Sequence, residues 1–267
     1  LIDCARSGVP AELVSMPLTG ATSLVTLREA VVQHCAENLS GVTIHQLAGR
    51  GAPIVYGGAP AAFDMRRGTT PMGAMETMMI DMSYAQVGKY LGLPTHAYMG
   101  LSDSKCPDYQ AGLESGIGAV LAALAGINVV SGAGMLDYLL SQSLEKVLLD
   151  HEACALAHRL TAGVAQREGD VVELIGELTR SSSFLADPHT RKHWREELTV
   201  SSPLIDRDTY GDWEQKGARW AHERAASEVA RLLERAEPTP LGEEVAAAVD
   251  GIMLAEARRA GLDAMPG

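Results

Sequence analysis

The feature of this sequence that most limits its fold is the alternation of short apolar runs with helical segments between residues 12 and 142. Each apolar run has strand character, and a stretch with helical periodicity follows it. The expected strands are Glu12–Met16, Ala52–Tyr56, Thr95–Leu101 and Ile127–Val130. This alternation is typical of βαβ units, in which parallel strands form a sheet covered by helices. The sequence therefore predicts an α/β protein.

The segments between these strands have recognisable helix signals. Thr26 and Glu29 form the pattern of a capping box, and Asp108 stands where a helix would need an N-cap. The expected helices in this part are 26–39, 42–47, 77–91 and 108–125. Four strand–helix repeats are half the number in an eight-stranded (β/α)8 barrel of the TIM type.

Beyond residue 142 the pattern becomes wholly helical. Asp187 and Pro188 have the residue types of an N-cap and of the first position of a helix. The expected helices are 143–165, 171–178, 188–198, 213–235 and 241–260. We therefore expect two parts: an incomplete barrel of about four βα units at 1–142, and a helical C-terminal extension at 143–267 that packs on it.

Composition excludes several classes of function. A formal net charge of −12 over 267 residues argues against binding nucleic acid, which requires a basic surface. The four cysteines form no C-x-x-C pair, as expected for free thiols in a reducing compartment. The longest apolar run, Ile117–Val130, is too short to span a bilayer. These observations favour a cytoplasmic protein that does not bind a membrane.

Reactive side chains are concentrated just after the third expected strand. Asp103, Lys105, Asp108, Tyr109 and Gln110 lie within one short loop that leads into a helix. Carboxylates and aromatic rings attract a substituted ammonium ion, and such loops carry the chemistry of α/β barrels. The alternative interpretation is a solvated loop in which Asp108 only caps the helix.

This stretch, PTHAYMGLSDSKCPDYQAGLESG at Pro94–Gly116, resembles the corrinoid-dependent trimethylamine/glycine betaine methyltransferase family. The segments GATSLVTL at Gly20–Leu27, GAMETMMID at Gly73–Asp81 and GINVVSGAGMLD at Gly126–Asp137 strengthen the resemblance, which runs from about residue 12 to about residue 260. Members of that family are longer, so the resemblance implies that this chain is the C-terminal portion of such a protein. Half a barrel would leave open strand edges, from which we expect a homo-oligomer.

The resemblance also implies roles for particular residues. Tyr109 stands in the position of pyrrolysine, which implies the branch without pyrrolysine, whose substrates are quaternary amines such as glycine betaine. Tyr109, Asp103 and Asp108 would then be catalytic, as an aromatic face and counter-charges for the ammonium group. Tyr98, Lys105, Gln110 and Glu76 would bind substrate, and Lys105 would meet a substrate carboxylate. Glu76 has a second explanation, because an acid in the first turn of a helix also complements its dipole.

Ser131 and Gly132 belong to a glycine-rich turn after the last expected strand, and they are the candidates for cofactor contact. The turn lacks the G-x-G-x-x-G spacing of a dinucleotide site. Close approach of a corrinoid or its carrier is one explanation, and a tight packing turn is the other.

Metal and corrinoid motifs are absent from the sequence. His189 and His193 have the spacing of two zinc ligands, but no glutamate follows His189 as H-E-x-x-H requires, so we expect no metal site. The D-x-H-x-x-G motif of corrinoid carriers is also missing. The resemblance therefore implies a small methylated amine as substrate and a separate, cognate corrinoid protein as partner.

Other functions remain open at this level. Trimethylamine is an alternative substrate. A lyase or aldolase would use Lys105 as a Schiff-base amine if burial lowered its pKa. A non-catalytic betaine-binding protein would keep the site without the methyl transfer.

Overall fold

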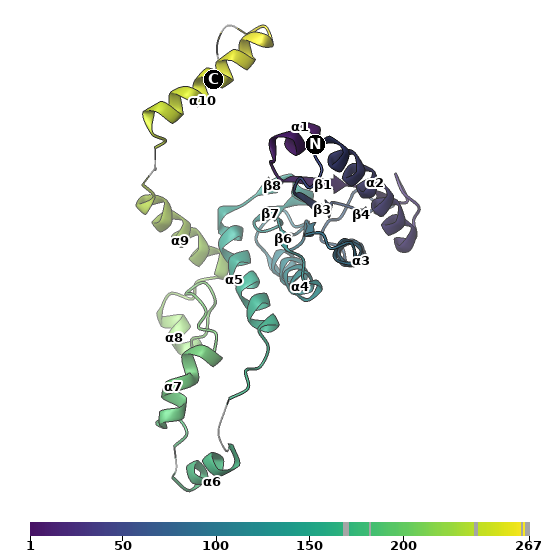
Figure 1. Cartoon of the computed structure of the whole chain (residues 1–267). Coiled ribbons are helices and arrows are strands. Elements are labelled where there is room, and N and C mark those ends of the chain that lie inside the picture. The colour runs from purple at the N-terminus through teal and green to yellow at the C-terminus, as the bar shows by residue number, and fades with distance from the viewer. Residues whose placement is uncertain (168–170, 182, 238–239, 263, 265–267) are drawn as a thin grey trace. The chain divides into compact units, whose positions relative to one another are not determined.

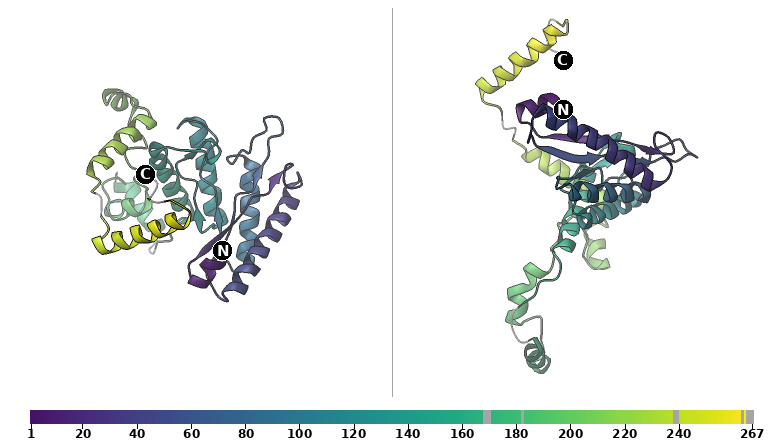
Figure 2. Two further views of the ribbon diagram at one scale, coloured as in Figure 1. Left: turned by 90° about the horizontal axis from the view of Figure 1, so that it is seen from above. Right: turned by 45° about the vertical axis from the view of Figure 1, so that its right-hand side comes forward.

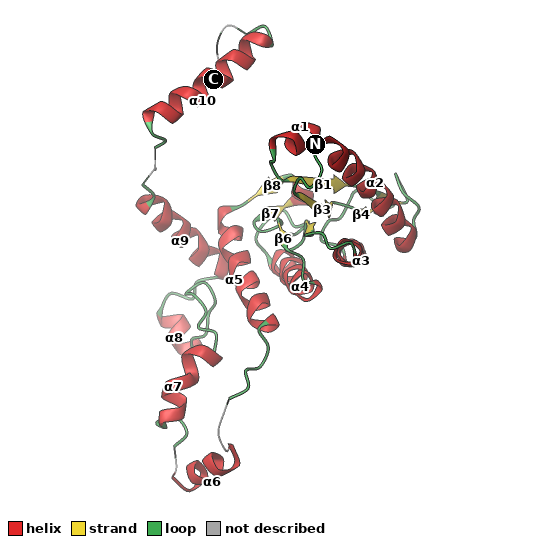
Figure 3. Ribbon diagram, viewed as in Figure 1, coloured by secondary structure: helices red, strands yellow, loops and turns green. Residues whose placement is uncertain are grey.

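The computed structural model describes residues 1–167, 171–181, 183–237, 240–262 and 264. The chain forms two compact units, Leu1–Val229 and Ala230–Gly267. Strands alternate with helices only as far as β8 (Ser141–Gln142), and the described elements after it are all helices (Figure 3). The α/β class predicted from the sequence is therefore confirmed. The predicted division between 142 and 143 stays a prediction.

Four parallel strands organise the first part of the chain: β1 (Ala11–Ser15), β3 (Ile54–Gly58), β5 (His96–Ala97) and β6 (Val129–Val130). β1 pairs with β3, and β5 pairs with β6, both in parallel. A parallel bridge between Tyr56 and Thr95 joins the two pairs. The strands thus stand side by side in chain order. Among the described residues they do not close into a barrel, so the predicted barrel stays a proposal.

Helices connect consecutive strands and lie on one side of them. They are α2 (Leu27–Ala48), α3 (Met75–Tyr90) and α4 (Tyr109–Ala125) (Figures 1 and 2). α2 contacts α3, α3 contacts α4, and α4 packs against α5 (Leu144–Thr161). Neighbouring strands joined by neighbouring helices are the arrangement of successive βα units in one turn of a barrel.

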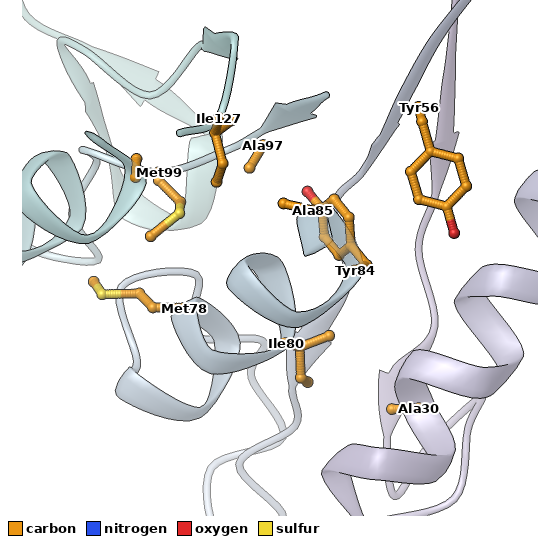
Figure 4. Close-up of a cluster of buried hydrophobic side chains, with 10 residues drawn as sticks. Ala30, Tyr56, Met78, Ile80, Tyr84, Ala85, Ala97, Met99 and Ile127 are labelled. Carbon is orange, nitrogen blue, oxygen red and sulfur yellow. The ribbon is translucent and has the colours of Figure 1, made fainter. Parts of the chain in front are cut away.

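The strands present two faces with different chemistry. The outer face packs on the helices through Tyr56, Ala97 and Met99, which lie with Met78 and Tyr84 of α3 in the main hydrophobic core (Figure 4). Because side chains alternate along a strand, the residues between these point to the opposite, inner face. The inner face carries polar groups, which are described below.

Two helices differ from the sequence prediction. α2 continues through Gly41, so the two helices predicted at 26–39 and 42–47 are one helix. A Cβ at Gly41 would come within 2.6 Å of Leu13 Cδ2, so the glycine here allows close packing on β1 and does not end the helix. The predicted helix 213–235 is two helices, α8 (Tyr210–Gln215) and α9 (Ala221–Arg235), since Gly217 and Ala218 between them have φ of 95° and 50°.

The remaining elements are short or lie in the C-terminal part. They are α1 (Ile2–Ser7), β2 (Leu18–Thr19), β4 (Ala61–Ala62), β7 (Met135–Leu136), η1 (Asp137–Leu139), α6 (Val171–Ser181), α7 (Pro188–Glu197) and α10 (Glu243–Arg259). β7 and β8 form an antiparallel hairpin that the sequence did not predict. Within the described residues, none of the helices combines the length and apolar character needed to cross a bilayer.

Candidate active site

Asp103 ties two loops together at the carboxyl ends of the strands. Its side chain is only 6% exposed. Oδ1 accepts a hydrogen bond from the backbone N–H of Met72 at 2.9 Å, and Oδ2 accepts one from Gly73 at 3.0 Å. Burial, and secondarily the nearby Glu114 carboxylate, raise the pKa of Asp103 to about 6. Asp103, predicted as a catalytic counter-charge, therefore holds the loop before α3 against the loop after β5.

Glu114 of α4 accepts hydrogen bonds from Asp103 and its neighbour Ser102, and the sequence analysis did not predict it. Its Oε2 accepts hydrogen bonds from Ser102 Oγ at 2.6 Å and from the backbone N–H of Asp103 at 2.8 Å. Its Oε1 accepts one from Gln110 Nε2 at 2.9 Å. Gln110, predicted to bind substrate, thus lies on the exposed surface of α4. The i, i+4 spacing of Gln110 and Glu114 was the available signal.

Asp108 and Tyr109 lie at the start of α4. Asp108 Oδ1 accepts hydrogen bonds from the backbone N–H of Ala111 and from Ser104 Oγ, both at 2.9 Å, and the first of these lowers its pKa. Asp108 is therefore the N-cap, as the alternative interpretation of the sequence proposed. Tyr109 is 84% exposed. Both residues line a cavity of about 540 Å³ between α4 and α5, which Trp220 also lines.

Lys105 joins the loop after β5 to the hairpin after β6. Its Nζ donates a hydrogen bond to the carbonyl oxygen of Asp103 at 2.7 Å and forms an ion pair with Asp137 Oδ1 at 3.1 Å. The same Nζ lies 4.0 Å from the centroid of the Tyr138 ring. The backbone N–H of Asp137 donates to the carbonyl oxygen of Ser104 at 3.0 Å, which fixes the two loops to each other.

The inner face of the strands carries a polar network that the sequence analysis did not predict. Nδ1 of His96 on β5 contacts Oε1 of Glu12 on β1, and its Nε2 contacts Oγ of Ser131 after β6. The His96 ring meets the Tyr98 ring edge to face, with centroids 4.9 Å apart. Burial lowers the pKa of His96 and raises that of Glu12, so both groups favour their neutral forms.

Gly57 on β3 makes this network possible. A Cβ at Gly57 would lie 2.9 Å from Glu12 Oε1 and 3.0 Å from His96 Nδ1, so only glycine lets the two side chains meet across the middle strand. A polar residue at an inward position of an apolar strand, as at His96, was the available signal. The partners could not be read from the sequence, because they come from different strands.

The other predicted residues lie apart from this network. A Cβ at Gly132 would lie 2.1 Å from the carbonyl oxygen of Met99, so the turn is packed against residues 99–101, which follow β5. Glu76 is exposed in the first turn of α3 and lines a separate cavity of about 490 Å³ with Thr19 and Arg66. His189 and His193 have ring centroids 4.8 Å apart on α7. Over the described part of the chain, no group of three metal-binding side chains occurs.

The fold and the site define a parallel α/β protein with its polar loops gathered at the carboxyl ends of the strands. The chain belongs to the trimethylamine methyltransferase family, since the model described as "Trimethylamine methyltransferase (MTTB)" matches residues 1–260. The resemblance found in the sequence is thereby confirmed.

Relatives support the same family. A trimethylamine methyltransferase of Desulfitobacterium hafniense is 34% identical over 95% of this chain and 51% of its own length. One of Methanosarcina thermophila is 34% identical over 92% of this chain and 50% of its own length. A glycine betaine methyltransferase of Desulfitobacterium hafniense is 29% identical over 98% of this chain and 54% of its own length. The chain thus spans about half the length of the curated relatives that it matches.

Proposed function

We propose that the full-length protein carrying this chain transfers a methyl group from a methylated amine to the cobalt of a separate corrinoid protein. The observation that carries this proposal is the family match over residues 1–260, which includes every strand and loop of the candidate site. The C–N bond breaks, its electron pair stays on nitrogen, and a Co–C bond forms. A quaternary amine leaves as a neutral tertiary amine, so the reaction needs positioning and exclusion of water rather than an acid.

The substrate that we propose is a quaternary amine of the glycine betaine type. The resemblance implies that Tyr109 stands in the position of pyrrolysine, and this supports the choice, as does the relative named glycine betaine methyltransferase. Trimethylamine is the second candidate, because more similar relatives carry that name.

The contacts refine the roles proposed for individual residues. We propose that Asp103 acts by positioning its loop, because its two oxygens are used by backbone N–H groups. Tyr98, Ser131 and Gly132 remain candidates for the inner surface of the site, and Tyr109 for the α4–α5 cavity. A Schiff-base lyase finds no support, since Lys105 is paired with Asp137 rather than buried as a free amine.

The test is a visible-light assay of Co(I) conversion to methyl-Co(III). The full-length protein and its corrinoid protein are incubated with glycine betaine, trimethylamine, choline and dimethylamine in separate reactions. We expect methylation of cobalt with glycine betaine or a close quaternary analogue, and a slower rate in Tyr109→Phe. Methylation with none of these amines would refute the proposed activity, and a preference for trimethylamine would refute the proposed substrate.

Asp103 gives this activity an expected pH dependence. Its pKa is about 6, and the ionised form accepts strong hydrogen bonds on both oxygens from Met72 and Gly73. Protonation leaves a hydroxyl oxygen that accepts only weakly, which weakens the hydrogen bond from one backbone N–H and loosens the loop. We therefore expect kcat/KM to fall about tenfold for each pH unit below about 6.

The variant Asp103→Asn separates this group from others that titrate nearby. Asparagine does not ionise and presents an N–H to one of the two backbone donors. Its rate should be low and nearly independent of pH between about 5 and 7. An unchanged acidic limb in Asp103→Asn would assign that limb to another residue.

A further inference from the structure

We propose that the ring of Tyr138 and the carboxylate of Asp137 form the binding site for the substrate's ammonium group, which Lys105 occupies until substrate displaces it. This inference rests on the proposed function, which it makes more specific. Neither residue was a candidate on sequence grounds.

The position beside Tyr138 and Asp137 already holds an ammonium group, that of Lys105. Lys105 Nζ lies over the Tyr138 ring at 4.0 Å from its centroid and 3.1 Å from Asp137 Oδ1. An aromatic face beside a carboxylate is the chemistry by which proteins recognise quaternary ammonium groups. The Lys105 side chain is therefore a direct indication of what the position attracts.

The backbone that carries the Tyr138 ring has an unusual conformation. Asp137, Tyr138 and Leu139 have φ of 49°, 57° and 73°, which is the left-handed region for three successive residues other than glycine. Each such residue costs about 1–2 kcal/mol. Strain of this kind clusters at ligand-binding positions, where the surroundings fix the conformation.

Those surroundings are visible in the hairpin. β7 and β8 pair through Met135 with Gln142 and Leu136 with Ser141, so the left-handed turn closes a hairpin whose strands hold its residues in place. The backbone N–H of Asp137 is also bonded to Ser104, as described above. The ring of Tyr138 is thus presented by a fixed turn rather than by a free loop.

Lys105 is held weakly enough for a substrate to displace its ammonium group. Its side chain is 60% exposed, and an ion pair at such exposure contributes about 0–1 kcal/mol. When Lys105 moves away, its ammonium group becomes fully hydrated. A trimethylammonium group has no N–H, so it cannot replace the hydrogen bond from Lys105 to the carbonyl of Asp103. It would bind through its charge and through methyl contact with the ring, and the aromatic face would favour it.

Position in the fold agrees with this assignment. Lys105 lies in the loop after β5, and the Asp137–Leu139 turn lies in the β7–β8 hairpin after β6 and is hydrogen-bonded to that loop, so both follow the carboxyl ends of adjacent parallel strands. Ligands of barrel enzymes bind at that end.

The experiment measures binding of tetramethylammonium to the full-length protein by isothermal titration calorimetry, without the corrinoid protein. This probe carries the cation but no carboxylate. We expect Lys105→Gln to tighten its binding up to about fivefold, because the internal competitor is gone. We expect Tyr138→Leu to weaken it by about 2- to 30-fold, and the matched control Tyr138→Phe, which keeps the ring, to bind as the unaltered protein does.

Asp137→Asn is a second variant that tolerates the left-handed backbone, and it should also weaken binding. Circular dichroism of each variant shows that it is folded. If Lys105→Gln leaves tetramethylammonium binding unchanged and weakens glycine betaine binding, Lys105 binds the substrate carboxylate and the inference is wrong. Binding that is equal in Tyr138→Leu and Tyr138→Phe also overturns it.

The two proposals fail separately. If tetramethylammonium binds as expected and no amine methylates cobalt, the ammonium site stands and the methyltransferase activity does not. If cobalt is methylated while these variants bind tetramethylammonium like the unaltered protein, the activity stands and the site lies elsewhere.

Discussion

Replacing Gly132 by alanine is expected to lower the melting temperature of the full-length protein by roughly 10 °C or to prevent folding. The added Cβ would lie 2.1 Å from the carbonyl oxygen of Met99, 2.8 Å from its carbonyl carbon and 3.0 Å from Leu101 Cβ. The first two are backbone atoms, so no side chain can rotate to make room. The turn after β6 would have to move away from residues 99–101 after β5, which would also strain the hydrogen bond from Ser131 N–H to the carbonyl oxygen of Ala97 in β5.

Gly112→Ala on α4 is the matched control. A Cβ at Gly112 meets nothing within 4 Å, and alanine is about 0.5–1 kcal/mol better than glycine inside a helix. We expect this variant to melt at the same temperature as the unaltered protein or slightly above it. The measurement is differential scanning calorimetry of both variants at one pH. A Gly132→Ala protein that melts normally but has lost activity would favour contact with a bound group over packing, the two explanations that the sequence left open for this turn.

The local parts of the fold could be predicted because their causes are local. The alternation of apolar runs with helical periodicity identified the four parallel strands to within a few residues. Asp108 and Asp187 were recognised as N-caps, and each accepts a backbone hydrogen bond in the first turn of its helix. These signals depend on residues only a few positions apart.

The arrangement of the site depends on long-range contacts and was not predictable in the same way. Glu12 reaches His96 only because Gly57 leaves space on the strand between them, and nothing local in the sequence marks that glycine as different from a turn glycine. The left-handed turn at Tyr138 was also missed, because none of its three residues is glycine. Asp103 was predicted as a catalytic counter-charge, and that role stays a prediction; its hydrogen-bond donors lie 30 and 31 residues earlier, so they could not be identified from the local sequence.

The second large effect is expected at Asp81, whose ionisation changes the free energy of unfolding with pH. It lies in α3, 1% exposed, and within the described part of the chain neither carboxyl oxygen has a hydrogen-bond partner. Burial raises its pKa well above the ordinary value of 3.8. The folded protein therefore retains a proton that the unfolded chain releases. The stability contributed by this carboxyl group is fully present below pH 3.8 and is lost as the pH rises toward its folded pKa.

Asp81→Asn removes this titration, because asparagine is neutral at every pH. Relative to the unaltered protein, we expect the variant to gain about 1.4 kcal/mol in free energy of unfolding for each pH unit between about 5 and the pKa of the folded carboxyl group. Its advantage in melting temperature should therefore grow from pH 5 to pH 8. Denaturant unfolding of the full-length protein at several pH values gives the same difference directly.

Asp64→Asn is the control, because folding lowers the pKa of Asp64 whereas it raises that of Asp81. Asp64 is a partly buried carboxylate, 17% exposed, whose pKa is lowered to about 2, first by the backbone N–H of Arg66, so its contribution is lost only as the pH falls below 3.8. It should change nothing in the slope between pH 5 and 8. A difference between Asp81→Asn and the unaltered protein that stays constant over that range would mean that Asp81 is ionised in the fold.

The position of Asp81 connects this stability effect to the candidate site. Tyr84, one turn further along α3, donates hydrogen bonds to the carbonyl oxygens of His96 at 2.8 Å and Gly58 at 3.2 Å. The buried acid therefore lies beside the tyrosine that anchors the strand bearing the Glu12–His96–Ser131 network. An ionised Asp81 would place an uncompensated charge beneath that network, and a neutral one would not. If the neutral form is the native one, Asp81→Asn should stabilise the protein at pH 8 and leave the binding of tetramethylammonium unchanged.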